Sequence, residues 1–199
     1  MDDRQIGAIV TSTPDRGTYT VPGLDQEAAG TLVTALQDRL TALTDLHLTL
    51  KHVHWNVVGP HFIAVHEMLD PQVDTVREMT DDVAERIATL GGSPVGTMGA
   101  MVAARSWEDY HLGRDGTAAH LGALDLVYQG VIIDHRKAIG TAGDVDPVTE
   151  DLLIGQAAKL ELFHWFVRAH LESASGVLAT QGETSEKGAA AAAQAAEHD

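Results

Sequence analysis

The sequence predicts an all-α fold, a four-helix bundle with one long connection between the second and third helices. Three observations support this prediction. Apolar residues recur at three- and four-residue intervals along four long segments, Gly and Pro residues separate these segments, and no stretch alternates as a half-buried strand would. A chain of 199 residues is long enough for one domain with a substantial core.

The first predicted helix runs from Asp25 to Val58. Leucine and valine recur along it with helical spacing, and Gly59 and Pro60 end it. Residues 1–22 precede it and contain Pro14, Gly17 and Pro22, so we expect an irregular N-terminal arm.

The second predicted helix runs from Phe62 to Leu90, where Gly91 and Gly92 act as C-terminal breakers. Pro71 lies inside it and removes one backbone donor. We therefore expect a kink at this proline, or a division of the helix into two.

The third predicted helix covers 115–140. Asp146 and the proline after it form an N-cap and first-turn pair, which opens a fourth helix that reaches about Thr180. The segment 181–199 is of low complexity and is predicted to be a flexible tail.

The segment 93–114 is the long crossover, and an apolar run at 98–103 predicts a short helix within it. Short links join the first helix to the second and the third to the fourth. This is the ferritin-like arrangement, and we assign residues 23–180 to the bundle.

The composition restricts the chemistry. Acidic residues outnumber basic residues by 29 to 13, and the net charge of −16 disfavours capture of nucleic acid and favours gathering of cations. The absence of cysteine leaves His, Asp and Glu as metal ligands. No apolar run is long enough to span a membrane and no basic secretory signal begins the chain, so we expect a cytoplasmic protein.

A stripe of polar residues on the second helix provides candidate metal ligands. At 100° per residue, His66, Asp70, Asp81 and Glu85 fall within an arc of about 100°. His54, near the end of the first helix, would lie beside the start of this stripe. A merely solvated helix face is an alternative explanation for these four residues.

One metal ion cannot use the whole stripe, because Asp70 and Asp81 are roughly 16 Å apart along a straight helix and metal bonds are about 2 Å long. The residues could serve two separate sites. Alternatively, a two-fold axis could place the early end of one helix against the late end of its partner. Mixed imidazole and carboxylate ligation suits Fe(II).

The run KHVHWNVVGPHFIAVHEMLD at 51–70 and the run DDVAERIATLGG at 81–92 resemble the signature of the Dps family of ferritin-like shell proteins. The resemblance covers roughly residues 25–178. It implies an iron site shared between two subunits, with Trp55 beside it, and with His54, His66 and Asp70 of one subunit facing Asp81 and Glu85 of the partner subunit.

The resemblance further implies a ferroxidase and iron-storage subunit. Twelve subunits, assembled from two-fold dimers, would enclose a cavity in which Fe(II), oxidised by hydrogen peroxide or dioxygen, is stored as ferric mineral, protecting the cell and its DNA. Zinc or manganese at the same ligands remains an alternative. Because ligand imidazoles must be neutral, we expect activity to fall as the pH drops below the histidine range.

Other histidines and acids have simpler explanations. His47 and His52 are expected to pack or to support the site rather than to bind metal. Glu161 and His164 form a Glu-x-x-His pair typical of a di-iron centre within one bundle, but the only matching pair lies in the crossover. We therefore expect structural or surface roles for both.

Three acids lie at the start of the fourth helix: Asp146, Glu150 and Asp151. The helix dipole alone explains them. The resemblance implies a second role, since similar acids in the family line three-fold pores that admit iron.

Both ends of the chain are acidic. Residues 180–199 contain four acids and one lysine, and residues 1–22 contain three acids and two arginines. Such tails are poor phosphate-binding arms, so we expect weak or absent DNA binding. A DNA-binding, nucleoid-condensing shell with a secondary metal site is the alternative function.

Overall fold

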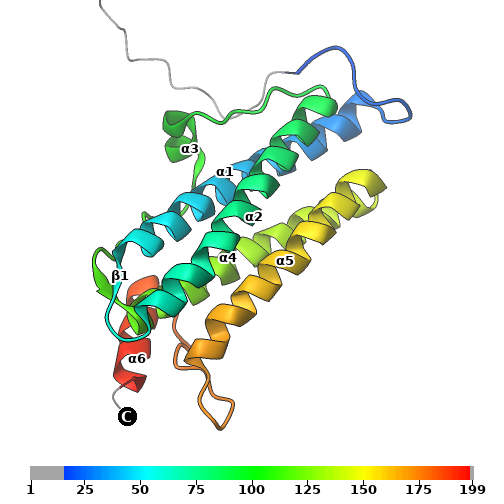
Figure 1. Ribbon diagram of the computed structural model, residues 1–199. Helices are drawn as coiled ribbons and strands as arrows, with labels where there is room; N and C mark the ends of the chain where they lie inside the picture. Colours follow the sequence, from blue (N-terminus) through cyan, green and yellow to red (C-terminus); the bar gives the residue numbers. More distant parts are fainter. Residues whose placement is uncertain (1–15, 198–199) are drawn as a thin grey trace, which may run out of the picture.

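The computed structural model describes residues 16–197 (Figure 1). Four long helices form a bundle, and a crossover with one short helix joins the second long helix to the third, which confirms the predicted ferritin-like fold. The helices are α1 (Gln26–Asn56), α2 (Phe62–Thr89), α3 (Met98–Ala104) in the crossover, α4 (Thr117–Gly143), α5 (Pro147–Leu171) and α6 (Glu186–Ala196).

A hydrophobic core lies between the four long helices. α1 packs against α2 and α4, and α4 packs against α5 and α6 (Figure 1). Burying a leucine side chain contributes about 1.5–3 kcal/mol, so the apolar stripes of these helices hold the bundle together. Fully buried side chains include Leu32, Leu36, Leu43, Leu46 and Leu50 of α1, Leu69, Met79 and Ile87 of α2, Tyr128 of α4 and Leu153 of α5.

Two short strands pair with each other at one end of the bundle. β1 (Val57–Val58) follows α1 directly and pairs in parallel with β2 (Asp115–Gly116), which precedes α4. At the other end of α2, residues 16–22 contain no helix, and Gly17 donates its backbone N–H to the carbonyl of Gly91. The remainder of the expected N-terminal arm, residues 1–15, lies outside the described residues.

Pro71 does not divide α2. The helix is continuous from Phe62 to Thr89. Buried side chains on both sides of the proline, Leu69 and Val73, anchor the helix to the core, so packing outweighs the loss of one backbone hydrogen bond.

The fourth long helix ends earlier than predicted, at Leu171 rather than near Thr180. The chain then turns back through Gly176, whose φ of 82° suits glycine, and Glu172 pairs with Leu178.

The prediction of a flexible tail was wrong for residues 186–196, which form α6. Ser185 caps the helix by accepting from the backbone N–H of Gly188. The alanine-rich sequence reads as low complexity, yet alanine has the highest helix propensity, and its small side chains let α6 lie close to α4. Among residues 16–197, no helix is both long enough and apolar enough to cross a membrane.

Candidate metal centre

Two histidine rings stack where the end of α1 lies beside the start of α2. The centroids of the His54 and His66 rings are 3.6 Å apart, and their planes differ by 23°. His54 lies in the last turn of α1 and is buried, whereas His66 lies early in α2 and is half-buried. The structure therefore brings together the two histidines that the sequence analysis selected.

Each of the two rings is held by the backbone of the other residue. His54 Nδ1 is 3.0 Å from the carbonyl oxygen of His66, and His66 Nδ1 is 2.9 Å from the carbonyl oxygen of His54. A carbonyl only accepts, so each Nδ1 must carry the hydrogen. This network assigns the tautomer and leaves both Nε2 atoms with free lone pairs, the form in which neutral imidazole binds metal.

A tight turn makes this arrangement possible. Gly59 has a φ of 94° and His61 a φ of 62°, both in the left-handed region, and α2 begins directly afterwards. Thr117 of α4 donates its hydroxyl to the carbonyl of Pro60 and fixes the turn to the bundle. The chain thus reverses within a few residues, which places the end of α1 beside the start of α2.

Asp70, one turn after His66, lies beside His54 on this subunit. Its Oδ1 is 3.3 Å from His54 Nδ1 and 2.9 Å from Lys51 Nζ. The Lys51 ammonium, through this hydrogen bond, holds the pKa of the Asp70 carboxyl below its usual range. Lys51 was not among the residues expected at the site, although its position one turn before His54 places both on one face of α1.

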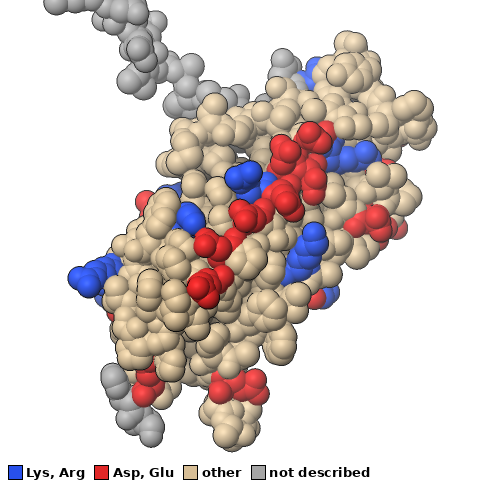
Figure 2. Space-filling view, viewed as in Figure 1, with Lys and Arg blue, Asp and Glu red and all other residues tan. Residues whose placement is uncertain are grey.

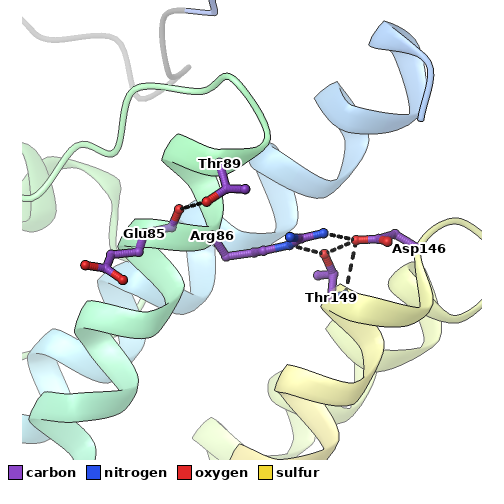
Figure 3. A network of polar contacts seen from close by, with 5 residues as sticks. All are labelled: Glu85, Arg86, Thr89, Asp146 and Thr149. Atoms are coloured by element: carbon purple, nitrogen blue, oxygen red, sulfur yellow. Dashed lines mark hydrogen bonds and ion pairs between the residues drawn. The ribbon is translucent and has the colours of Figure 1, made fainter. Parts of the chain in front are cut away.

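Asp81 and Glu85 lie further along α2 and do not reach the histidines. Both are exposed, and Glu85 points away from the bundle, opposite to Arg86 (Figure 3). Among residues 16–197, no three or more His, Asp or Glu side chains of one chain are gathered closely enough to hold a metal ion. The site shared with a second subunit therefore stays a prediction.

A band of acidic side chains runs over α2 on the outside of the bundle (Figure 2). A row of carboxylates on one surface raises the local concentration of cations. The exposed acids of α2 are Glu67, Asp70, Asp74, Glu78, Asp81, Asp82 and Glu85.

Three exposed apolar side chains lie close in sequence to the histidine pair, and one of them contacts it. Trp55 is 70% exposed, and Phe62 and Ile63 are also exposed. The ring of Phe62 is 5.0 Å from that of His66. Exposed apolar groups around a polar site are typical of a surface that another protein covers.

Asp146, one of the three predicted pore acids, has a structural role on this chain (Figure 3). It caps α5, accepting from the backbone N–H and hydroxyl of Thr149, and it pairs with Arg86 of α2. Burial acts to raise the pKa of Asp146, but the contacts with Thr149 and Arg86 outweigh it and lower the pKa. Glu150 is half-buried and Asp151 is exposed. Their pore role stays a prediction.

Glu161 and His164 have different partners. Glu161 pairs with Arg136 at the surface, whereas His164 Nε2 lies 2.6 Å from the buried carboxylate of Asp125. Asp125 also accepts from Arg168 and from Thr180, which ties the returning C-terminal segment to α4.

His52 has a partner of its own in the crossover, since its Nε2 lies 2.7 Å from the carbonyl oxygen of Leu112. The pKa of the half-buried His47 is lowered, by burial first and by the nearby Arg77.

Comparisons with known proteins agree with this fold. The family described as Ferritin-like domain matches residues 33–177. The chain is 60% identical over 172 residues to the DNA protection during starvation protein of Mycolicibacterium smegmatis, which covers 86% of this chain and 94% of that protein. It is 47% identical over 172 residues to the fine tangled pili major subunit of Haemophilus ducreyi, covering 86% and 91% of the two chains.

A solved structure is also similar. DpsA14 from Streptomyces coelicolor superposes with a TM-score of 0.80 and 67% sequence identity, covering 83% of this chain and 97% of that one.

Proposed function

This chain belongs to the Dps family of ferritin-like proteins, and from that premise we propose that it is a ferroxidase and iron-storage subunit of a hollow, twelve-subunit shell. The observation that carries the proposal is the stacked pair of His54 and His66, whose Nδ1 atoms contact backbone carbonyls so that their Nε2 atoms are left for a metal. The carboxylate of Asp70 lies 3.3 Å from His54 Nδ1.

The proposed site is completed by a second subunit. Antiparallel packing about a two-fold axis would bring the partner subunit's Asp81 and the partner subunit's Glu85 to the histidine pair. The exposure of Trp55, Phe62 and Ile63, which are apolar and close in sequence to the histidines, supports a contact here. The spacing of about 16 Å along α2 between Asp70 and Asp81 supports a shared site, since one chain cannot close it.

The substrate is Fe(II). Two Fe(II) ions each give one electron to hydrogen peroxide, which takes up two protons and becomes two molecules of water. Neutral imidazoles bind Fe(II), and the anionic carboxylates stabilise the higher charge of Fe(III) more than that of Fe(II). The acidic band of α2 supplies cations to the site and favours deposition of ferric ions nearby. Dioxygen is the alternative oxidant.

The same ligands would bind zinc or manganese, so occupancy by these metals is a second outcome of any metal titration. We place the activity in the cytoplasm, where it would protect the cell and its DNA from iron and peroxide together.

The test is anaerobic loading with Fe(II), followed by a pulse of hydrogen peroxide and optical detection of Fe(III). We expect the double variant His54→Ala with His66→Ala to lose most of the rapid oxidation. His170→Ala, which removes an exposed histidine at the end of α5, is the matched control and should keep the full rate. Equal rates in the double variant and the control would refute the proposal. Mass measurement of both variants must first show the same assembly as the parent.

The second candidate function is DNA binding, which the name of the Mycolicibacterium smegmatis relative favours. The acidic ends of the chain argue against a simple electrostatic mode. We expect no shift of plasmid DNA in a gel at about 150 mM salt, a concentration at which phosphate contacts are already weakened. A clear shift there would favour the nucleoid-condensing alternative.

A further inference from the structure

The C-terminal helix α6 is held on α4 mainly by small side chains. Its buried residues are Ala189, Ala190 and Ala193, and a Cβ atom on Gly122 of α4 would lie only 2.4 Å from the carbonyl oxygen of Ala189. Such close contact fixes the geometry but buries little apolar area. A modest electrostatic change can therefore move the balance between docked and undocked α6.

A cluster of carboxylates lies where α6 begins. Glu186, in the first turn of α6, lines a cavity of about 240 Å³ together with Asp45 of α1 and Glu108 of the crossover. Glu186 Oε2 is buried and accepts no hydrogen bond from any residue of 16–197. The basic side chain closest to it in a recorded contact is His111, whose Nδ1 is 3.7 Å away.

The other charged groups around the cluster make recorded contacts elsewhere or line the cavity and the groove beside it. Asp45 accepts from the indole of Trp107 and from Arg105. The remaining charges line this cavity or the groove beside it without any recorded contact to the Glu186 carboxylate: Arg39 of α1, Asp134 of α4, Asp109 of the crossover and Lys187 of α6.

We infer that α6 is a pH-sensitive latch, docked on α4 when Glu186 is protonated and loosened when Glu186 ionises against Asp45 and Glu108. Ionisation places a third negative charge in a confined space that α1, the crossover and α6 share. Undocking removes that repulsion because Glu186 moves into water with α6. The inference is independent of the iron chemistry proposed above.

The direction of the pH effect follows from linkage. Burial first, and then Asp45 and Glu108, raise the pKa of Glu186 to about 7 when α6 is docked. In the undocked chain the same carboxyl returns to its ordinary pKa of 4.5. Docking is therefore strongest below that value, weakens as the pH rises to about 7, and is constant above it. Since the side chain of Glu186 is 28% exposed, we expect a change of about tenfold in the docking equilibrium rather than the full effect of the shift.

The chain has no cysteine, so one introduced thiol is a unique probe. Ala190→Cys places this thiol on the buried face of α6. The labelling rate of the assembled protein, divided by that of the denatured chain at the same pH, reports the undocked fraction. We expect this ratio to rise about tenfold between pH 5 and pH 8. Hydrogen exchange of the α6 amides, corrected for intrinsic rates, measures the same equilibrium without the thiol.

Three further variants test the cause. Glu186→Gln removes the titrating group and should abolish the pH dependence. Glu197→Gln removes an exposed acid after the other end of α6 and should leave the pH dependence unchanged. Glu108→Gln removes one repelling neighbour, which should move the midpoint to lower pH. A pH-independent ratio in the parent, or an unchanged pH dependence in Glu186→Gln, would overturn the latch.

Discussion

Arg86 of α2 and Asp146 at the N-terminus of α5 form an ion pair that joins two helices with no direct connection in the chain (Figure 3). The side chains of both residues are largely buried, 13% and 10% exposed. This pair shows why an acid at a helix start can have a role that the helix dipole alone does not reveal.

Replacing the acid of this pair should destabilise the fold. We expect Asp146→Ala to lower the free energy of unfolding by about 2–4 kcal/mol, because α5 loses its cap and Arg86 is left without a counter-charge. Denaturant unfolding followed by circular dichroism measures the change. Asp151→Ala, at an exposed position in the first turns of α5, should change stability by less than about 1 kcal/mol. A larger loss for Asp151→Ala than for Asp146→Ala would contradict this assignment.

In the proposed iron site, Lys51 would compete with the metal for Asp70. Lys51→Met removes an ammonium that is 2.9 Å from Asp70 Oδ1. We expect about two- to fivefold tighter Fe(II) binding, because the carboxylate is released and a nearby positive charge is lost. Anaerobic titration with Fe(II) measures the affinity, with Lys159→Met on the exposed face of α5 as the control. Weaker binding in Lys51→Met would mean that the lysine positions Asp70 for the metal instead.

Asp125 makes stability depend on pH in the acid range. Burial acts to raise its pKa, but hydrogen bonds from His164, Thr180 and Arg168 outweigh it and hold the pKa at about 2. Because the pKa is lower in the folded chain, this contribution is complete above about pH 4 and is lost as the pH falls towards 2. Asp125→Asn should therefore destabilise the protein by about 2 kcal/mol at neutral pH and by much less near pH 2. Urea unfolding at several pH values tests this, and a constant difference would exclude the linkage.

Gly122 sets the distance between α4 and α6. Gly122→Ala places a Cβ atom 2.4 Å from the carbonyl of Ala189, so we expect α6 to detach while the bundle stays folded. Faster tryptic cleavage after Lys187 would report this. Gly130→Ala adds the same methyl group to α4 where nothing lies within 4 Å, and it should only stabilise the helix, by up to about 1 kcal/mol. Equal cleavage rates in the two variants would show that the close approach does not hold α6.

The bundle could be predicted from the sequence because its four long helices bury continuous stripes of leucine and valine, a pattern that tertiary contacts reinforce. α6 could not, since alanine gives no apolar stripe and its partner surface on α4 is far away in the sequence. The end of α5 was missed for a similar reason: the residues after Leu171 tolerate helix, and Thr180 is drawn away by its hydrogen bond to Asp125.

The candidate site was predicted in part. His54, His66 and Asp70 come together because a short turn joins their helices, and such local proximity follows from spacing. The contact of Lys51 with Asp70 depends on the reach and rotamer of a long side chain, which spacing does not determine. The relation of Asp81 and Glu85 to the histidines depends on how two copies meet, which lies beyond the geometry of one chain.

Because α2 continues unbroken through Pro71, it holds the two halves of the proposed site at a fixed separation. A newly made subunit diffusing alone would then be chemically idle, with unfinished halves that cannot fold onto each other. Competence would arrive only when a second subunit supplies the other half across the two-fold axis, so that iron oxidation begins with assembly and not before it.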